Sequence, residues 1–202
     1  MDARSDLTRR QCDSAGATAV RRSAAKTILN VGHISVLKGN RSEILACLPG
    51  NLDIQQRGVD SAEDDSGLDA WTVMMELAHQ RNTIVVMTGK EDYITDGSRK
   101  VTIKNGHKYQ AAVTGTGCCL GTTISAMVAA YPEDKFTATV AALLHYNIAA
   151  EIAAKRADVK GPGTFVPAFL DELFNIRVAT GKGDLQWLNR ARLTEIPQLV
   201  GG

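Results

Sequence analysis

The sequence has few cysteines and almost no net charge. Its four cysteines, at positions 12, 47, 118 and 119, form no Cys-x-x-Cys pair. Neither a zinc site nor a disulfide framework is therefore indicated, and reduced thiols in the cytoplasm are expected. Basic residues exceed acidic ones by a single charge, so no bulk field draws the chain to nucleic acid or to an anionic membrane. Its partners are expected to be small molecules or proteins.

Long apolar runs are also missing. No stretch approaches the roughly 20 residues that a transmembrane helix needs, and the first residues lack the apolar core of a secretory signal. The chain does contain the material for a core, because 44% of its 202 residues are hydrophobic and 22% are charged. These values are typical of one globular domain and exclude the disordered and fibrous classes.

The most informative stretch is VTGTGC, residues 113–118, which leads into a small apolar run with helical spacing. Gly115 and Gly117 allow a left-handed backbone and a close approach to a ligand. The backbone N–H groups around Thr116 then point at one spot with the helix dipole behind them, an arrangement that suits a phosphate. The alternative is that a small-residue turn caps a buried helix and that both adjacent cysteines fill the core.

Cys118 gives this turn a candidate catalytic group. A thiol at a helix N-terminus has a pKa lowered from about 8.5 toward roughly 3.5–7.5. Such a thiolate can take a proton from an alcohol that lies beside a bound phosphate.

Hydrophobic periodicity predicts alternating helices and strands, and therefore an α/β fold. The expected helices cover residues 17–30, a segment starting near 40, 68–79, 136–155 and 167–176, and the expected strands cover 33–38 and 83–87. A hairpin is expected from 93–95 and 100–103, joined through Asp96 and Gly97. Residues 49–67 are expected to form a loop, and the chain from residue 177 a loosely ordered tail with a short helix near Trp187.

Two polar segments are expected at one edge of the sheet. Lys38 is the last residue of one predicted strand and Thr88 follows the next, and ligands in open α/β sheets bind beyond the carboxyl ends of parallel strands. Asn40 and Glu43 have the spacing of an N-cap residue and its capping-box partner. Carboxylate and amide oxygens beside a phosphate also suit a magnesium ion that keeps most of its waters, so the residues alone leave both roles open.

VTGTGC, followed by Leu-Gly and an alanine-rich helix, resembles the active-site segment of the hydroxyethylthiazole kinase family of the ribokinase-like superfamily. Family members stand alone or form the C-terminal half of a bifunctional fungal thiamine enzyme. The segments KGNRSEI, RGVDS, TGKEDYITDG and GPGTF carry the same resemblance. It implies a ribokinase-like, doubly wound α/β sheet.

The resemblance covers roughly residues 15–176, the later part of the family's domain. Residues 1–14 are expected to be a non-matching extension and 177–202 a tail, with the sheet incomplete at its N-terminal side. The family's Asp-Pro-Val-Gly run has no clear counterpart, because Gln11, Cys12, Asp13 and Ser14 stand there instead.

By this resemblance Cys118 is the catalytic base, and Cys119 is an apolar neighbour whose loss would reduce stability. The resemblance implies the remaining site residues as follows: Lys38 and Thr88 for the nucleotide, Asn40 and Glu43 for the metal, and Gly115, Thr116 and Gly117 for the anion.

The resemblance implies phosphorylation of 4-methyl-5-(2-hydroxyethyl)thiazole by ATP with Mg²⁺, in a homo-oligomer that is a trimer in the family. A kinase for the pyrimidine half of thiamine is one alternative, although relatives of that kind carry aspartate where this chain has Cys118. A catalytically silent fragment that associates with full-length kinase subunits is another. An upstream thiamine-phosphate synthase domain remains an open possibility.

Overall fold

The computed structural model describes residues 23, 27–30, 32–48 and 70–196. The chain divides into two compact units: the first comprises residues up to Val101 together with the segment from Glu195, and the second runs from Thr102 to Thr194. Residues 27–30 are helical, as expected. The loop predicted over 49–67, its RGVDS segment and the region of Asp13 lie outside the described residues. No described helix has the length and apolar character needed to cross a membrane.

The strands form a mixed sheet within an α/β fold. Its hydrogen-bonded order is β1-β2-β3-β4-β5, with bounds β1 Val36–Asn40, β2 Ile84–Thr88, β3 Asp92–Thr95, β4 Lys100–Ile103 and β5 Leu193–Glu195. Strands β1 and β2 are parallel, and β2 and β3 are antiparallel. The α/β prediction is confirmed at this level. The first strand begins three residues later than expected and continues through Asn40.

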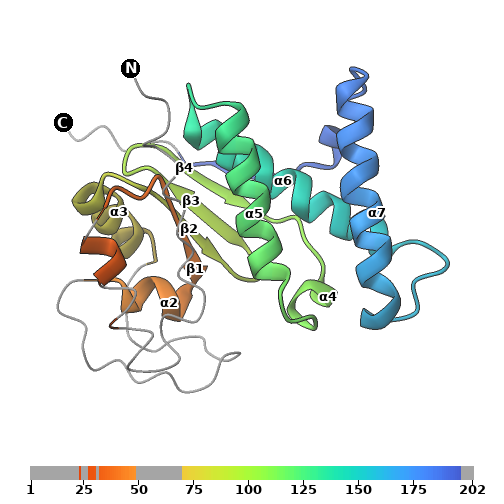
Figure 1. Cartoon of the computed structure of the whole chain (residues 1–202), viewed down its shortest axis with the longest axis horizontal. Helices are drawn as coiled ribbons and strands as arrows, with labels where there is room; N and C mark the ends of the chain where they lie inside the picture. Colours follow the sequence, from red (N-terminus) through yellow and green to blue (C-terminus); the bar gives the residue numbers. More distant parts are fainter. Residues whose placement is uncertain (1–22, 24–26, 31, 49–69, 197–202) are drawn as a thin grey trace. The chain divides into compact units, whose positions relative to one another are not determined.

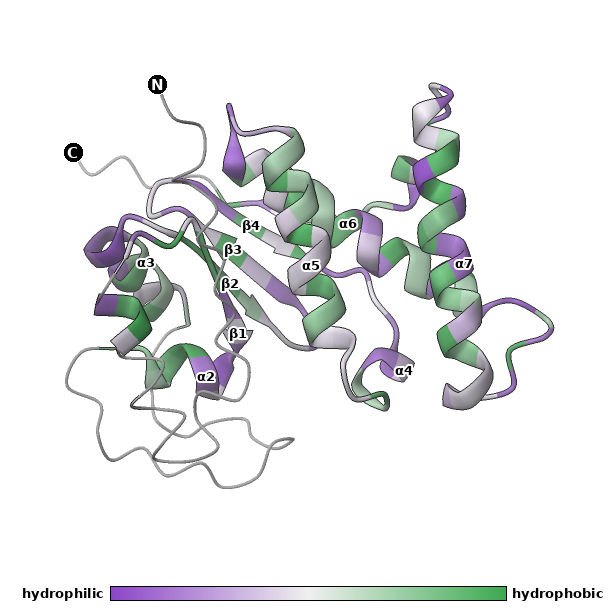
Figure 2. Cartoon of the chain, in the orientation of Figure 1, coloured by the Kyte–Doolittle hydropathy of each residue, from purple (hydrophilic) through white to green (hydrophobic). Residues whose placement is uncertain are grey.

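The first unit packs two helices, α2 (Arg41–Ala46) and α3 (Ala70–Arg81), against the strands (Figure 1). Helix α3 contacts β2 and β3, and α2 contacts β1. The β-branched sequence of β2 is buried at every position but the last, and Figure 2 colours this strand as hydrophobic. The helix residues that pack on this side are Ile44, Leu45, Val73, Met74, Leu77 and Ala78. Each large side chain fully buried here stabilises the fold by about 1.5–3 kcal/mol.

The predicted hairpin is confirmed as β3 and β4. Asp96 Oδ1 accepts the backbone N–H groups of Ser98 at 2.9 Å and Arg99 at 2.7 Å, and Gly97 takes a φ of 92°. Burial alone would raise the pKa of Asp96, but hydrogen bonds from the Arg99 and Ser98 backbone and from the Arg99 side chain lower it below the usual value. The ionised carboxylate therefore organises the turn.

The second unit is built on three long helices, α5 (Thr116–Ala130), α6 (Lys135–Ala154) and α7 (Pro162–Gly181), preceded by the short α4 (Lys108–Ala111). Helix α6 packs against both α5 and α7 (Figure 1). Asp134 caps it by accepting the N–H groups of Phe136 and Thr137, both at 3.2 Å. Most of α6 is buried, so this helix is the core of the unit.

The prediction for the end of the chain was wrong in two respects. Helix α7 begins at Pro162, not at Pro167, because proline suits the first position of a helix, where no N–H partner is needed. The helix continues to Gly181, and the 3-10 helix η1 (Gln186–Arg190) and β5 follow. The short helix near Trp187 is confirmed, but residues 177–196 are ordered rather than loose.

Candidate functional site

The carboxyl ends of β1 and β2 lie side by side, as the parallel pairing requires. Asn40 is the register partner of Thr88, and the Thr88 hydroxyl donates to the carbonyl of Gly39 at 3.4 Å. Lys38 lies two residues earlier on β1 and is only 5% exposed. The first unit therefore brings Asn40 and Thr88 together at this edge of the sheet, whereas Lys38 lies in the middle of β1, opposite Val86, because the strand continues to Asn40.

Asn40 and Glu43 form a complete capping box at the start of α2. Asn40 Oδ1 accepts the N–H of Glu43 at 2.9 Å, and Glu43 Oε2 accepts the N–H of Asn40 at 2.8 Å. Asn40 Oδ1 also accepts the hydroxyl of Ser42 at 2.8 Å. The helix-capping prediction is confirmed, and it accounts for both side chains without any ligand.

The same contacts test whether these residues suit the magnesium ion that the family implies. The single side-chain oxygen of Asn40 already accepts two hydrogen bonds, and one oxygen of Glu43 holds the cap. Among the described residues, no group of three or more His, Cys, Asp or Glu side chains could hold a metal ion. These contacts establish the capping role of the two residues, and their role toward magnesium stays a prediction.

The glycine turn belongs to the second unit and opens α5. Gly115 is the N-cap residue with a φ of 99°, a conformation that side chains disfavour. The Thr116 hydroxyl donates to the carbonyls of Gln110 at 2.8 Å and Val113 at 3.1 Å. The side chain of Thr116 therefore closes the turn, and any anion contact by this residue falls to its backbone N–H. Such N–H groups at a helix start are directed out of its N-terminal end.

Cys118 is the third residue of α5, inside the first turn as predicted. Both Cys118 and Cys119 are exposed, so neither fills the core of the described structure. This corrects the expectation that Cys119 supports stability, because an exposed thiol contributes little burial. Figure 2 shows α5 coloured as hydrophobic or neutral over most of its length, yet its buried residues are only Leu120 and Ile124.

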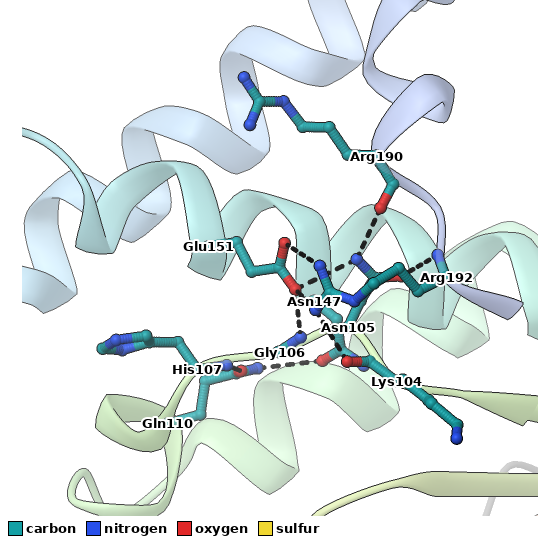
Figure 3. A network of polar contacts seen from close by, with 9 residues as sticks. All are labelled: Lys104, Asn105, Gly106, His107, Gln110, Asn147, Glu151, Arg190 and Arg192. Carbon is teal, nitrogen blue, oxygen red and sulfur yellow. Dashed lines mark hydrogen bonds and ion pairs between the residues drawn. The ribbon is translucent and has the colours of Figure 1, made fainter.

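A polar network that the sequence did not reveal joins the start of α4 to α6 and the C-terminal segment (Figure 3). Glu151 of α6 is 7% exposed. Its Oε1 accepts Asn105 Nδ2 at 3.1 Å and the N–H of Gly106 at 2.9 Å. Arg192 pairs with the same carboxylate and donates its backbone N–H to Asn105 Oδ1 at 2.6 Å. No local spacing relates these residues, so no sequence motif could have identified the network.

A second branch of this network reaches the glycine turn. Gln110 Oε1 accepts the N–H of His107 at 2.8 Å, and Gln110 Nε2 donates to Asn147 Oδ1 of α6 at 3.1 Å. Since the carbonyl of Gln110 accepts the Thr116 hydroxyl, α6 supports the turn through this residue. His107 and Gln110 have the spacing of a capping box, although histidine is an unusual N-cap residue. This spacing is the local sequence signal that could have pointed to the network.

The predicted site residues thus fall into two groups, one in each structural unit. The strand-end group consists of Lys38, Asn40, Glu43 and Thr88, and the turn group consists of Gly115, Thr116, Gly117 and Cys118. Their roles toward a nucleotide, a metal or an anion stay predictions.

Comparison with known protein families matches residues 13–179 to the model "Hydroxyethylthiazole kinase family". A hydroxyethylthiazole kinase of Thermoanaerobacter pseudethanolicus is 44% identical over 165 residues, which cover 80% of this chain and 60% of that protein. A "Probable thiamine biosynthetic bifunctional enzyme" of Schizosaccharomyces pombe is 36% identical over 184 residues, covering 88% of this chain and 35% of that protein.

Among solved structures, the hydroxyethylthiazole kinase protein of Pyrococcus horikoshii OT3 superposes with a TM-score of 0.74 at 33% identity. The match covers 92% of this chain and 64% of that one. The chain therefore spans less than two thirds of the length of these relatives.

Proposed function

Because the chain belongs to the hydroxyethylthiazole kinase family, we propose that it serves the ATP-dependent phosphorylation of 4-methyl-5-(2-hydroxyethyl)thiazole. The observation that carries this proposal is the place of Cys118 in the first turn of α5, behind the left-handed Gly115. At that place the helix dipole favours a thiolate and an anionic ligand alike. A base and an anion site therefore coincide on one short segment.

In the proposed reaction, Cys118 accepts the proton of the primary alcohol as the alcohol oxygen attacks the γ-phosphorus of ATP. The bond from that phosphorus to the β,γ-bridging oxygen breaks, and ADP leaves. The backbone N–H groups from Gly115 to Cys118 hold the transferred phosphoryl group. Cys118 then returns its proton to solvent. Positioning and electrostatic stabilisation supply most of the barrier reduction in such transfers.

The strand-end group supports the nucleotide part of the proposal. Thr88 lies at the carboxyl end of the parallel pair β1 and β2, where α/β sheets bind their ligands, and Lys38 lies two residues before the end of β1. The complete doubly wound sheet of the ribokinase-like superfamily and a homo-oligomeric, trimeric state belong to the same proposal. Native mass measurement of the purified chain tests the trimer.

A second candidate follows from the share of the relatives that this chain covers, between 35% and 64% of the three proteins compared. A chain of this extent can act as a catalytically silent partner that associates with full-length kinase subunits. The third possibility is phosphorylation of a hydroxymethylpyrimidine.

One set of assays separates these possibilities. ADP release is measured for the chain alone, with ATP, magnesium and either the thiazole alcohol or the pyrimidine alcohol. Thiazole-dependent ADP release supports the main proposal, and pyrimidine-dependent release overturns it. If the chain alone is inactive, it is mixed with a stand-alone hydroxyethylthiazole kinase. Co-migration of the two proteins without a gain in turnover then supports the silent partner, and the absence of both turnover and association contradicts both candidates.

A further inference from the structure

Thr116, the first residue of α5, is held from two sides. Its hydroxyl is bonded to the carbonyls of Gln110 and Val113 within the preceding turn. Its carbonyl accepts the hydroxyl of Tyr146, on α6, at 2.7 Å. The first fixes the turn to the helix, and the second fixes the helix start to the core of the unit.

Tyr146 is well placed to act as a rigid anchor. It is 1% exposed, and its ring packs edge-to-face on Phe169 of α7 with 4.8 Å between centroids. Phe169 in turn stacks on Phe165 at 5.2 Å. Because stacked rings on α7 hold the Tyr146 ring, its hydroxyl has little freedom to leave the Thr116 carbonyl.

The phenol also remains a hydrogen-bond donor while the nearby thiols ionise. Burial raises the pKa of Tyr146 well above its usual value, and negative charge on Cys119 and on Cys118 raises it further. A thiolate at either position thus keeps the neighbouring phenol protonated. His107 reaches the same aromatic cluster through Phe165, with ring centroids 6.3 Å apart.

We propose that Tyr146 is a positioning residue for Cys118. By holding the Thr116 carbonyl from α6, it keeps the first turn of α5 in the geometry that presents the thiol and the first-turn N–H groups to one ligand. That this positioning matters for catalysis rests on the proposed kinase function. The geometry of the turn does not depend on that function, so it can be tested without measuring turnover.

The test measures alkylation of Cys118 by iodoacetamide as a function of pH, read by mass spectrometry on the peptide that contains it. A Cys119→Ser background leaves Cys118 as the single thiol of that peptide. Tyr146→Phe keeps the ring and removes only the donor, so the helix start loses its anchor and its stabilisation of the thiolate. We expect the midpoint of the alkylation profile to rise and the rate at pH 7 to fall about 3–10-fold, with equal rates once the thiol is fully ionised.

Tyr131→Phe is the matched control, because Tyr131 lies at the other end of α5 and is 50% exposed. It should leave the profile unchanged. An unchanged midpoint in Tyr146→Phe overturns the proposal. So does faster alkylation at every pH, which would indicate mere loosening of the structure.

If Tyr146→Phe lacks a cooperative unfolding transition, Phe169→Leu decides the question, because it removes the ring that packs on Tyr146 and keeps the Tyr146 hydroxyl. The same rise in midpoint is expected, and an unchanged midpoint overturns the proposal. A raised midpoint in a chain that never turns over ATP would support the positioning of the thiol and count only against the kinase function.

Discussion

A methyl group at Gly39 would lie 2.8 Å from the Cβ of Glu43. The end of β1 and the first turn of α2 can therefore approach as they do only while position 39 has no side chain. The requirement is one of space, since the obstructing atom is a Cβ fixed to the helix backbone rather than the end of a flexible side chain. This contact ties the edge of the sheet to the capping box.

Gly39→Ala should lower the free energy of unfolding by about 1–3 kcal/mol, the usual effect of overpacking a tight contact. Chemical denaturation of the purified chain measures it. Gly32→Ala is the control, because a Cβ at Gly32 meets no atom within 4 Å. Equal stability of the two variants would contradict the steric argument.

Glu43→Gln should separate capping from charge. Glutamine can fill the third position of a capping box, so the free energy of unfolding should stay within about 0.5 kcal/mol of the unmodified chain, whereas Glu43→Ala should lose about 1 kcal/mol. If the carboxylate also supports a phosphate or metal region, Glu43→Gln should reduce ATP turnover about 10–100-fold. Full turnover in Glu43→Gln would leave Glu43 as a capping residue alone.

Cys118→Ala should lower ATP turnover by about 10²–10⁴-fold, as expected for the loss of a general base. It is measured as ADP release in whichever preparation turns over, the chain alone or its complex with a stand-alone kinase. Cys119→Ala should leave turnover nearly intact. Both variants should unfold at nearly the original temperature, since both thiols are exposed. If Cys119→Ala turned over ATP more slowly than Cys118→Ala, the assignment of the base to Cys118 would be wrong.

Arg192→Met should destabilise the second unit. It removes the charge that faces the buried Glu151 carboxylate. Since the Arg192 side chain is 54% exposed, solvent screens part of the pair, and a loss of about 1–2 kcal/mol is expected. Arg190→Met is a matched control, because Arg190 contributes only its carbonyl to the network (Figure 3). Denaturant unfolding compares the two, and equal losses would argue against the ion pair.

Stability should fall in mild acid through His145. This ring is buried, and Nε2 lies 3.0 Å from the carbonyl of Leu173. Burial lowers its pKa below the usual value of about 6.5, although the Leu173 hydrogen bond opposes the shift. The unfolded chain then binds a proton that the folded chain does not, so this contribution is complete above about pH 6.5 and is lost as the pH falls below it. The free energy of unfolding, measured from pH 7.5 to 5, should fall less steeply with falling pH in His145→Gln than in the unmodified chain. An unaltered pH dependence in this variant would exclude His145 as the source of the acid sensitivity.

Some features of this protein could be predicted because they depend on neighbouring residues only. The capping box of Asn40 and Glu43, the hairpin turn at Asp96 and Gly97 and the helix start at Gly115 all follow from local backbone and hydrogen-bond rules. The parallel pairing that places Thr88 beside Asn40 was within reach, because two consecutive apolar strands joined by a helical segment favour it. Element ends were less certain, as the start of α7 at Pro162 shows.

Only the tertiary structure determined how the helix start at Gly115 is held. The Tyr146 hydroxyl of α6 donates to the Thr116 carbonyl of α5, and Arg192, which follows η1, pairs with the Glu151 carboxylate of α6. The exposure of Cys119 likewise depends on what packs around α5, not on the residues beside it. Such contacts join residues that no periodicity relates, and a buried donor or carboxylate can be satisfied by many partners of similar free energy. Packing of the helices selects one of them, because it alone decides which polar groups are buried together.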